Sequence, residues 1–421
     1  MKNLIFLLFL VSQTLQAQSI YYLKADRLFD GEVVHEKWGV VVKDRKIEVV
    51  GNQTDIERNL PAEARTLDFG NATLLPGLIE GHSHLLLHPY NETSWDDQVL
   101  KEPRAMRVAR ATVHAERTLM AGFTTVRDLG TEGADYDDVG LKQAINLGII
   151  KGPRMIVATR ALIATGSYAP KGFSPDVSVA QGAEEADGHD GLIKAVRTQI
   201  GKGADLIKIY ADYRWGLMGE ARPTYTQEEI KLIVDIASSS GRGVVAHAST
   251  TEGMRRAIEA GVETIEHGDA GTPEIFRLMA SKNVCLCPTL AAGDAISQYR
   301  GWIKGSEPEP ERLQKKRITF KQALDARVKI CMGGDVGVFA HGDNAREMEM
   351  MVNYGMSALE TLRSATSVNA DAFHYTDKIG RLQGGLLADI IVVEGNPSEQ
   401  ISDIRRVKFV MKEGRIYKSE K

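Results

Sequence analysis

Short apolar segments alternate with amphipathic helical segments through the middle of this 421-residue chain. Strands that alternate with helices run parallel, because each helix returns the chain to the starting edge of the sheet. Eight such units predict an α/β fold, a (β/α)8 TIM barrel. We expect the strands at residues 72–75 (continuing toward residue 84), 123–128, 155–159, 206–210, 244–247, 264–267, 284–288 and 328–333.

Both ends of the chain have a different sequence pattern, in which short β runs are separated by turn residues. Such runs are typical of antiparallel strands, so the two ends together predict a small β-sandwich domain beside the barrel. The expected division is residues 1–17 as a signal peptide, 18–75 with 385–421 as the sandwich, and 76–384 as the barrel.

The first residues have the layout of a secretory signal peptide. Lys2 gives a positive start, residues 4–11 are an unbroken apolar run, and Ala17 follows a short polar stretch. The run is shorter than the roughly 20 residues that a membrane-spanning helix needs. We therefore expect cleavage after Ala17, a periplasmic or secreted protein, and no membrane span.

Composition narrows the class of protein. The 52 Lys and Arg residues against 56 Asp and Glu residues leave a net charge of −4, which argues against a nucleic-acid binder. Three cysteines are too few and too uneven for a disulfide framework. We interpret Cys285 and Cys287, which alternate along one expected strand, as small core residues.

Ligand-type side chains recur where the expected strands end. Barrel enzymes place their catalytic groups at this end of the strands. His82 and His84 are two residues apart, so both can face the same side and bind one metal ion. A lone strand histidine is more often a core residue, but several at matching strand ends indicate a metal site. The six residues are His82, His84, Lys208, His247, His267 and Asp335.

Lys208 lies in an apolar strand, where a bare ammonium group would be expensive to bury. The alternative is a strand-end lysine whose amine reaches solvent.

The segment 76–84, with sequence Pro-Gly-Leu-Ile-Glu-Gly-His-Ser-His, resembles the opening signature of the amidohydrolase superfamily. The order of lysine, two histidines and aspartate that follows is also similar to that family. The segment 384–389 resembles the family's return from barrel to sandwich. The similarity covers nearly all of the chain after residue 17.

The resemblance implies a pair of divalent metal ions, usually Zn²⁺, joined by a carbamate that forms from Lys208 and CO2. His82, His84 and Asp335 would hold the first ion, and His247 and His267 the second. Carbamylation would turn the buried cation into an anionic ligand. Asp335 would also act as general acid and base, taking a proton from the attacking water and passing it to the leaving nitrogen.

Within the superfamily, the segments 245–248, 251–258 and 264–268 resemble the imidazolonepropionase-related group, which includes Xaa-Pro dipeptidase-like enzymes. The resemblance implies that Arg255 binds a substrate carboxylate; the alternative is a surface helix arginine. Tyr168 stands near where relatives carry a histidine that polarises the carbonyl, so its hydroxyl could take that role.

Two further residues are candidates for substrate binding. Tyr210 begins the segment 210–215 after the fourth strand, which is rich in groups that could line a pocket. His341 either binds substrate or caps the helix expected near Asn344.

The leading hypothesis is an exported hydrolase that cleaves dipeptides or N-acyl amino acids with a free C-terminal carboxylate. The alternative enzyme opens a cyclic amide or lactone at the same centre, and the non-enzyme hypothesis is a barrel that only binds ligands. Members of the family often form oligomers, so a homo-oligomer is one expectation for this chain.

Overall fold

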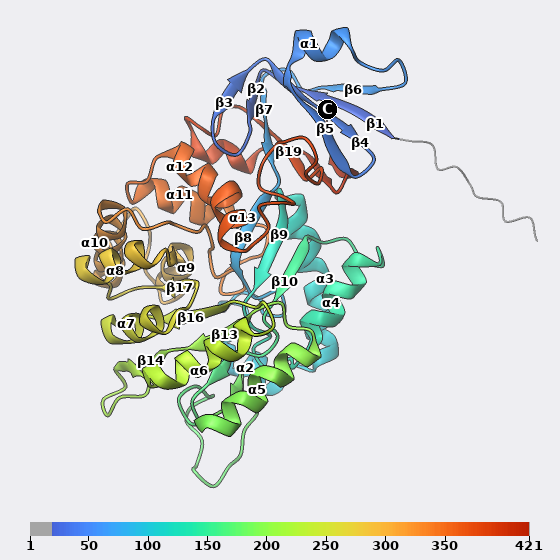
Figure 1. Cartoon of the computed structure of the whole chain (residues 1–421). Helices are drawn as coiled ribbons and strands as arrows, with labels where there is room; N and C mark the ends of the chain where they lie inside the picture. The colour runs from blue at the N-terminus through green and yellow to red at the C-terminus, as the bar shows by residue number, and fades with distance from the viewer. Residues whose placement is uncertain (1–18, 421) are drawn as a thin grey trace, which may run out of the picture.

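The structure, a computed structural model, describes residues 19–420, so the predicted signal peptide lies outside the described residues. Its larger part is an α/β, TIM-barrel-like arrangement in which parallel strands are surrounded by helices (Figure 1). No helix within residues 19–420 is both long enough and apolar enough to cross a membrane.

The parallel strands fall into two hydrogen-bonded groups. In the first, β9 (Phe123–Asp128) lies between β8 (Leu78–Ser83) and β10 (Arg154–Val157). In the second, the order is β12 (Glu184–Glu185), β11 (Leu162–Ile163), β13 (Ile207–Tyr210), β16 (Val244–Ala248), β17 (Thr264–His267) and β18 (Cys285–Cys287).

The structure differs from the sequence prediction at the first expected strand. The stretch from residue 72 to residue 84 is two strands, because β7 (Ala72–Pro76) pairs antiparallel with β19 (Ile390–Glu394) of the terminal strands. The parallel arrangement begins only at β8, on the other side of Gly77.

The eighth expected strand, 328–333, is reduced to one isolated bridge, and a second bridge lies just beyond it. Ile330 pairs with Leu286 of β18, and Val336 pairs with Ser83 at the end of β8. Both bridges are parallel, so this segment connects the last strand of one group to the first strand of the other.

Helices lie outside the strands (Figure 1), and the sequence marks several of their starts. Thr226 and Glu229 form a capping box at α6, whereas Thr250 and Thr272 cap α7 and α8 with their hydroxyls. The expected helices are present as α3 (Arg104–Met120), α5 (Gly188–Lys202), α6 (Gln227–Ser238), α7 (Thr251–Ala260), α8 (Pro273–Lys282) and α10 (Glu311–Asp325). Further helices are α2 (Trp95–Lys101), α4 (Asp137–Asn146), α9 (Leu290–Tyr299) and α11 (Ala345–Asn353).

The two ends of the chain meet in a unit of two sheets (Figure 1). Buried side chains from both sheets, among them Val40, Leu74, Ile390 and Phe409, share one apolar cluster. One sheet has the order β5 (Lys46–Asn52), β4 (Trp38–Lys43), β1 (Ile20–Lys24), β6 (Arg65–Asp68). The other has the order β21 (Arg415–Ser419), β20 (Val407–Lys412), β19, β7, β2 (Arg27–Phe29), β3 (Val34–Glu36).

A buried ion-pair network connects this unit to the parallel strands. Arg154 on β10 donates to Asp389 at 2.6 Å and to Glu413 at 2.7 Å, and Asp389 also accepts the Glu413 backbone N–H at 2.8 Å. The Asp389 side chain is only 3% exposed, so removal of the guanidinium would leave a buried charge without its cation.

We therefore expect Arg154→Ala to lower the free energy of unfolding by about 3 kcal/mol, within the range for breaking one side of a buried pair. Urea denaturation followed by circular dichroism measures this change. Arg197→Ala, an exposed arginine of α5, is the matched control and should change stability by no more than about 0.5 kcal/mol. Equal stabilities of the two variants would contradict the prediction.

Candidate metal centre and active site

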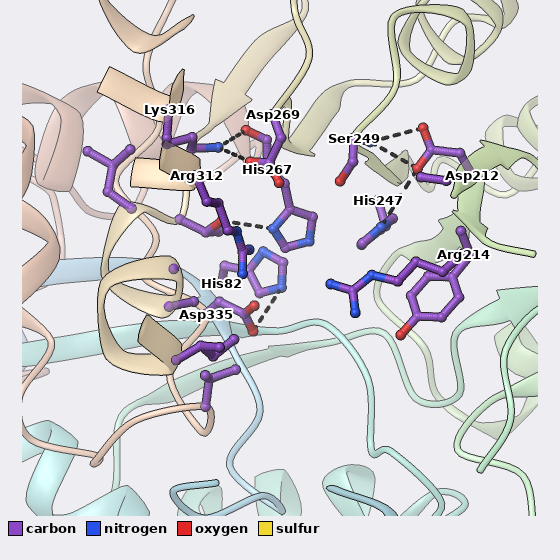
Figure 2. Close-up of a pocket in the computed structure, with 18 of the residues that line it drawn as sticks. His82, Asp212, Arg214, His247, Ser249, His267, Asp269, Arg312, Lys316 and Asp335 are labelled. Atoms are coloured by element: carbon purple, nitrogen blue, oxygen red, sulfur yellow. Dashed lines mark hydrogen bonds and ion pairs between the residues drawn. The ribbon is translucent and has the colours of Figure 1, made fainter. Parts of the chain in front are cut away.

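The carboxyl ends of the parallel strands open into one cavity of about 610 Å³. Its size suits a small-molecule ligand. All six residues that the sequence singled out as metal ligands line it, and Figure 2 shows His82, His247, His267 and Asp335 turned toward a common space. They are His82, His84, Lys208, His247, His267 and Asp335.

His82, His84 and Asp335 form the tightest group. Asp335 Oδ1 lies 3.6 Å from His82 Nε2 and 3.4 Å from His84 Nε2. One ligand atom from each of the three residues lies within 4.8 Å of the others. Two imidazoles and a carboxylate at this spacing are a suitable donor set for a divalent transition metal.

His247 and His267 lie beside this group. Their ring centroids are 4.4 Å apart, and the ring of His267 is 5.3 Å from that of His82. His267 Nδ1 is fixed by Thr289 Oγ1 at 2.8 Å, which leaves Nε2 as its free nitrogen. Burial lowers the pKa of His247 to about 3, so its imidazole is neutral at physiological pH, as a metal ligand must be.

Lys208 is 1% exposed, and no carboxylate of residues 19–420 lies within 4.0 Å of its ammonium nitrogen. Its nitrogen lies 5.6 Å from the centre of the Tyr210 ring. Burial lowers the pKa of Lys208 and so favours the neutral amine. A neutral amine is the form that reacts with CO2, so the environment fits the carbamate that the family resemblance implies.

Asp335 carries a charge that the pocket must compensate. Burial would raise its pKa, but His82 and His84 lower it to about 2. For His84 the two effects have the opposite signs. Burial alone would lower its pKa, but the hydrogen bond to Asp335 raises it to about 9. The position between them therefore favours positive charge, which a divalent cation can supply.

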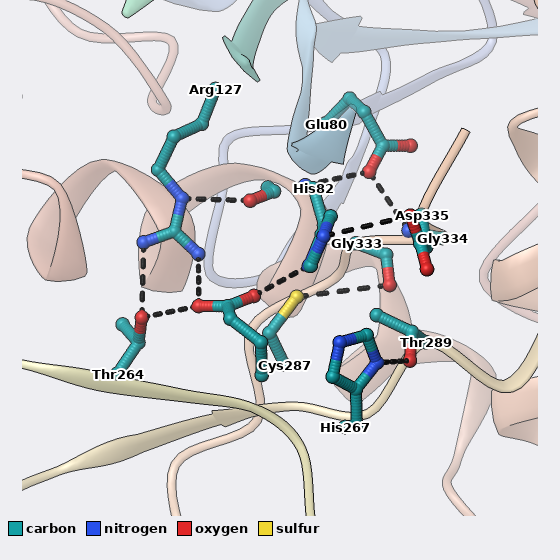
Figure 3. A network of polar contacts seen from close by, with 12 residues as sticks. Glu80, His82, Arg127, Thr264, His267, Cys287, Thr289, Gly333, Gly334 and Asp335 are labelled. Carbon is teal, nitrogen blue, oxygen red and sulfur yellow. Dashed lines mark hydrogen bonds and ion pairs between the residues drawn. The ribbon is translucent and has the colours of Figure 1, made fainter. Parts of the chain in front are cut away.

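A second layer of charged residues orients His82 (Figure 3). Its Nδ1 pairs with Glu266 Oε2 at 2.8 Å, and Glu266 Oε1 accepts from Arg127 at 2.8 Å. Burial would raise the pKa of Glu266, but Arg127 and His82 hold it well below its usual range. A carboxylate behind a histidine fixes its tautomer, so Nε2 is directed at Asp335 and the candidate metal position.

The backbone around the site is tightly constrained. A Cβ atom on Gly333 would lie 2.3 Å from Cys287 Sγ and 2.8 Å from His82 N, so only glycine fits there. His267 and Asp335 have φ angles of 76° and 62°, in the left-handed region that non-glycine residues rarely adopt. Such strain is of order 1–3 kcal/mol per residue, and it is concentrated at functional sites.

An aromatic group forms another part of the wall. Tyr168 and Tyr210, both predicted to bind substrate, line the cavity, and their hydroxyls donate to Glu132 at 2.5 and 3.3 Å. Trp95 Nε1 donates to the same carboxylate at 2.9 Å. The two tyrosine rings therefore face the cavity while their hydroxyls are held by Glu132.

Arg255 does not reach the cavity. It lies on α7, where Glu252 at 2.7 Å and Glu259 at 2.6 Å, one helical turn away on either side, bind its guanidinium. These helix-surface contacts correspond to the alternative interpretation, a surface helix arginine.

His341 is also turned away from the cavity. Its Nε2 pairs with the backbone oxygen of Leu87 at 2.9 Å, and its ring stacks on His114 with centroids 4.3 Å apart. It does not cap α11 either, because Asn344 occupies the N-cap position. Its place is in the packing beneath the loop after β8.

Sequence reasoning assigned no role to several residues that the structure brings to the site. Glu266 precedes His267, so the motif that revealed the histidine also contained its supporting carboxylate. Arg312 lines the cavity (Figure 2) but lies at a helix start, where no strand-end pattern marks it. Arg214 also lines the cavity and belongs to the segment 210–215, which the sequence marked as rich in pocket-lining groups without giving Arg214 a role of its own.

The chain belongs to the amidohydrolase family, whose model matches residues 73–417. Its sequence is 29% identical over 422 residues to ochratoxinase from Aspergillus niger, covering 92% of this chain and 84% of that enzyme. It is 22% identical over 369 residues to imidazolonepropionase from Salinispora tropica, covering 86% of each.

Solved structures of similar proteins support the same family assignment. A Xaa-Pro dipeptidase with bound methionine in its active site is 32% identical, with a TM-score of 0.82 and coverage of 95% of this chain and 100% of that one. The A. niger ochratoxinase structure has a TM-score of 0.80 and is 26% identical over 96% of each chain. The chain is therefore a hydrolase that acts on carbon–nitrogen bonds.

The Glu266 network leads to a test of metal binding. We expect Glu266→Gln to weaken divalent-metal affinity 10- to 100-fold, because His82 loses the carboxylate that orients it. Competition with a chelator, with bound metal quantified by elemental analysis, measures this. Glu263→Gln changes a half-exposed carboxylate at the start of the same strand, which pairs with His374 on the surface, and serves as control. Equal affinities of the two variants would show that His82 does not depend on Glu266.

Proposed function

We propose that this protein is an exported binuclear-metal amidohydrolase that cleaves dipeptides or N-acyl amino acids carrying a free C-terminal carboxylate. The observation that carries the proposal is the convergence of four histidines, Asp335 and an uncompensated buried Lys208 in one cavity. The similarity to a Xaa-Pro dipeptidase and to ochratoxinase supports amide bonds as the substrate class.

His82, His84 and Asp335 would hold one divalent ion, and His247 with His267 would hold the other; this donor chemistry suits zinc. A carbamate on Lys208 would join them. Bound there, the ions would lower the pKa of water and polarise the scissile carbonyl. The same donors also accept manganese, cobalt or iron, so metal identity belongs to the proposal.

The residues of the chain divide the remaining work. Asp335 takes the proton of the attacking water and returns it to the leaving nitrogen, which must be protonated before it departs. Glu266 keeps His82 in one orientation. The tyrosine rings of residues 168 and 210 give the substrate an apolar surface beside this centre.

The free carboxylate of the substrate needs a cationic partner in the cavity. Arg214 and Arg312 line it, whereas Arg255 is bound by glutamates on its own helix. We therefore assign the carboxylate contact to one of these two cavity arginines, because one planar guanidinium group can pair with both carboxylate oxygens.

The second candidate function is hydrolysis of a cyclic amide or lactone at the same centre. The similarity to imidazolonepropionase favours this alternative. Ring opening gives one product, whereas cleavage of a dipeptide gives two, so product analysis separates the two functions.

The cellular setting and the domain division are parts of the same proposal. The sequence of residues 1–17 supports export to the periplasm or outside the cell. We propose that residues 18–75 with 385–421 form a β-sandwich domain and that residues 76–384 form a closed (β/α)8 barrel. Assembly into a homo-oligomer is also part of the proposal, and the molar mass in solution tests it.

The first test is a substrate screen with protein from residue 18 onward, prepared with zinc and bicarbonate. We expect release of free amino acid from a set of dipeptides and N-acyl amino acids, and loss of that release after chelation. Amino-acid analysis measures both. Absence of release from metal-loaded protein, together with opening of cyclic amides or lactones, would replace the proposed function by the alternative.

The second test is Lys208→Ala. We expect loss of bound metal and a fall in hydrolysis of at least about 10³-fold, because the variant cannot form the bridging ligand. Metal content and kcat/KM measure the two effects. Lys194→Ala, an exposed lysine of α5, is the control. Unchanged hydrolysis by Lys208→Ala would rule out the carbamate-bridged centre.

A further inference from the structure

The charged residues that line the cavity are paired almost throughout. Asp269 accepts from Lys316 at 2.6 Å, and Glu311 pairs with Lys315 at 2.6 Å. Asp212 accepts the backbone N–H groups of Ser249 and Thr250, the latter at 2.7 Å. These three carboxylates are thus held by partners within the protein, and Glu132, which also lines the cavity, accepts hydrogen bonds from Trp95 and two tyrosines.

Apart from the buried Lys208, the exceptions among the described residues are Arg214 and Arg312. Neither guanidinium has a carboxylate within 4.0 Å among residues 19–420, although Arg312 is close enough to Asp269 to help lower the pKa of that carboxyl, which burial alone would raise. Both line the cavity. Unpaired cations are common on surfaces, but these two are directed into the same cavity as the candidate metal ligands.

The two arginines come from different walls. Arg214 ends β14 (Asp212–Arg214), in the hairpin with β15 (Ala221–Pro223), and Arg312 is the second residue of α10. Figure 2 shows their side chains extending from opposite sides toward the space beside His82 and Asp335. They therefore flank the position where a substrate would react.

The position of Arg312 is unfavourable without a ligand. The positive end of the helix dipole lies at the first turn of α10, where cations are disfavoured. A second unpaired guanidinium lines the same cavity and adds repulsion, although both arginines are exposed and solvent screens part of it. An anionic ligand would relieve both effects.

One carboxylate, the C-terminal group of the proposed substrate, accounts for one guanidinium. We infer that the substrate carries a second carboxylate, so that the cavity selects acidic dipeptides or acidic N-acyl amino acids. This inference rests on the proposed function and specifies its substrate class. The second carboxylate can belong to the residue on either side of the scissile bond, because either would place it in the same cavity.

Four dipeptides test the inference: alanyl-glutamate against alanyl-glutamine, and glutamyl-alanine against glutaminyl-alanine. Each pair has nearly the same shape and differs in one negative charge. We expect kcat/KM for the acidic member of at least one pair to exceed that of its amide by tenfold or more. The pair that shows the preference identifies the side of the scissile bond.

Arg214→Gln and Arg312→Gln then assign the two contacts. We expect one variant to lose the preference for the acidic substrate, and the other to weaken both members of the pair by a similar factor. Arg222→Gln on the same hairpin and Lys321→Gln on α10 remove exposed cations that pair with Glu220 and Asp325, and they should retain the wild-type preference.

The outcomes separate this inference from the proposed function. Hydrolysis of acidic and amide members at equal rates would overturn the inference and leave the dipeptidase function standing. A preference that survives in both arginine variants would also overturn it. If no dipeptide or N-acyl amino acid is cleaved by metal-loaded protein, the proposed function and the inference fall together.

Discussion

The close approach of β8 to the segment 330–336 is the constraint on which the site depends. Gly81 donates its backbone N–H to Met332 O at 3.0 Å, and a Cβ atom on Gly81 would lie 2.5 Å from that same oxygen. Glu80 reinforces the contact, because one oxygen accepts N–H groups from both His82 and Gly334. This contact brings Asp335 to the histidines of β8, although they are far apart in sequence.

The same geometry suits the site to a cation. Asp335 lies beside His82 and His84, and its hydrogen bond raises the pKa of His84, so positive charge is favoured at this position. Lys208 does not supply that charge, because burial disfavours its charged form. The donor groups are therefore candidate metal ligands, and the Arg127–Glu266 pair holds His82 from behind.

The predictable parts of the fold and site were those in which apolar residues recur at a regular spacing. Strand ends at His247 and His267 follow from apolar runs of fixed length, and parallel pairing necessarily brings such ends to one edge. The first strand was misplaced because β7 and β8 are both apolar and only Gly77 separates them. Arg255 was assigned by its position after the fifth strand, but its contacts depend on glutamates one turn away on the same helix.

Substrate-binding residues are less predictable for a physical reason. Arg214 lies on a hairpin and Arg312 at a helix start, and the direction of each side chain depends on loop conformations that carry no repeating pattern. Glu132 lies in the loop after β9, has a left-handed backbone conformation, and accepts a hydrogen bond from Tyr168. Most of the candidate metal ligands are therefore held by strands, whereas the two cavity arginines lie on the segments around them.

This division has a consequence for turnover. Two guanidinium groups that bind a substrate with two carboxylates stabilise the bound ground state as well as the transition state, which by itself does not raise kcat. If both carboxylates belong to the leaving amino acid, that product keeps both contacts and its release becomes slow. If cleavage separates them, each product keeps one contact and departs more readily. The position of the second carboxylate thus determines whether chemistry or product release limits the rate.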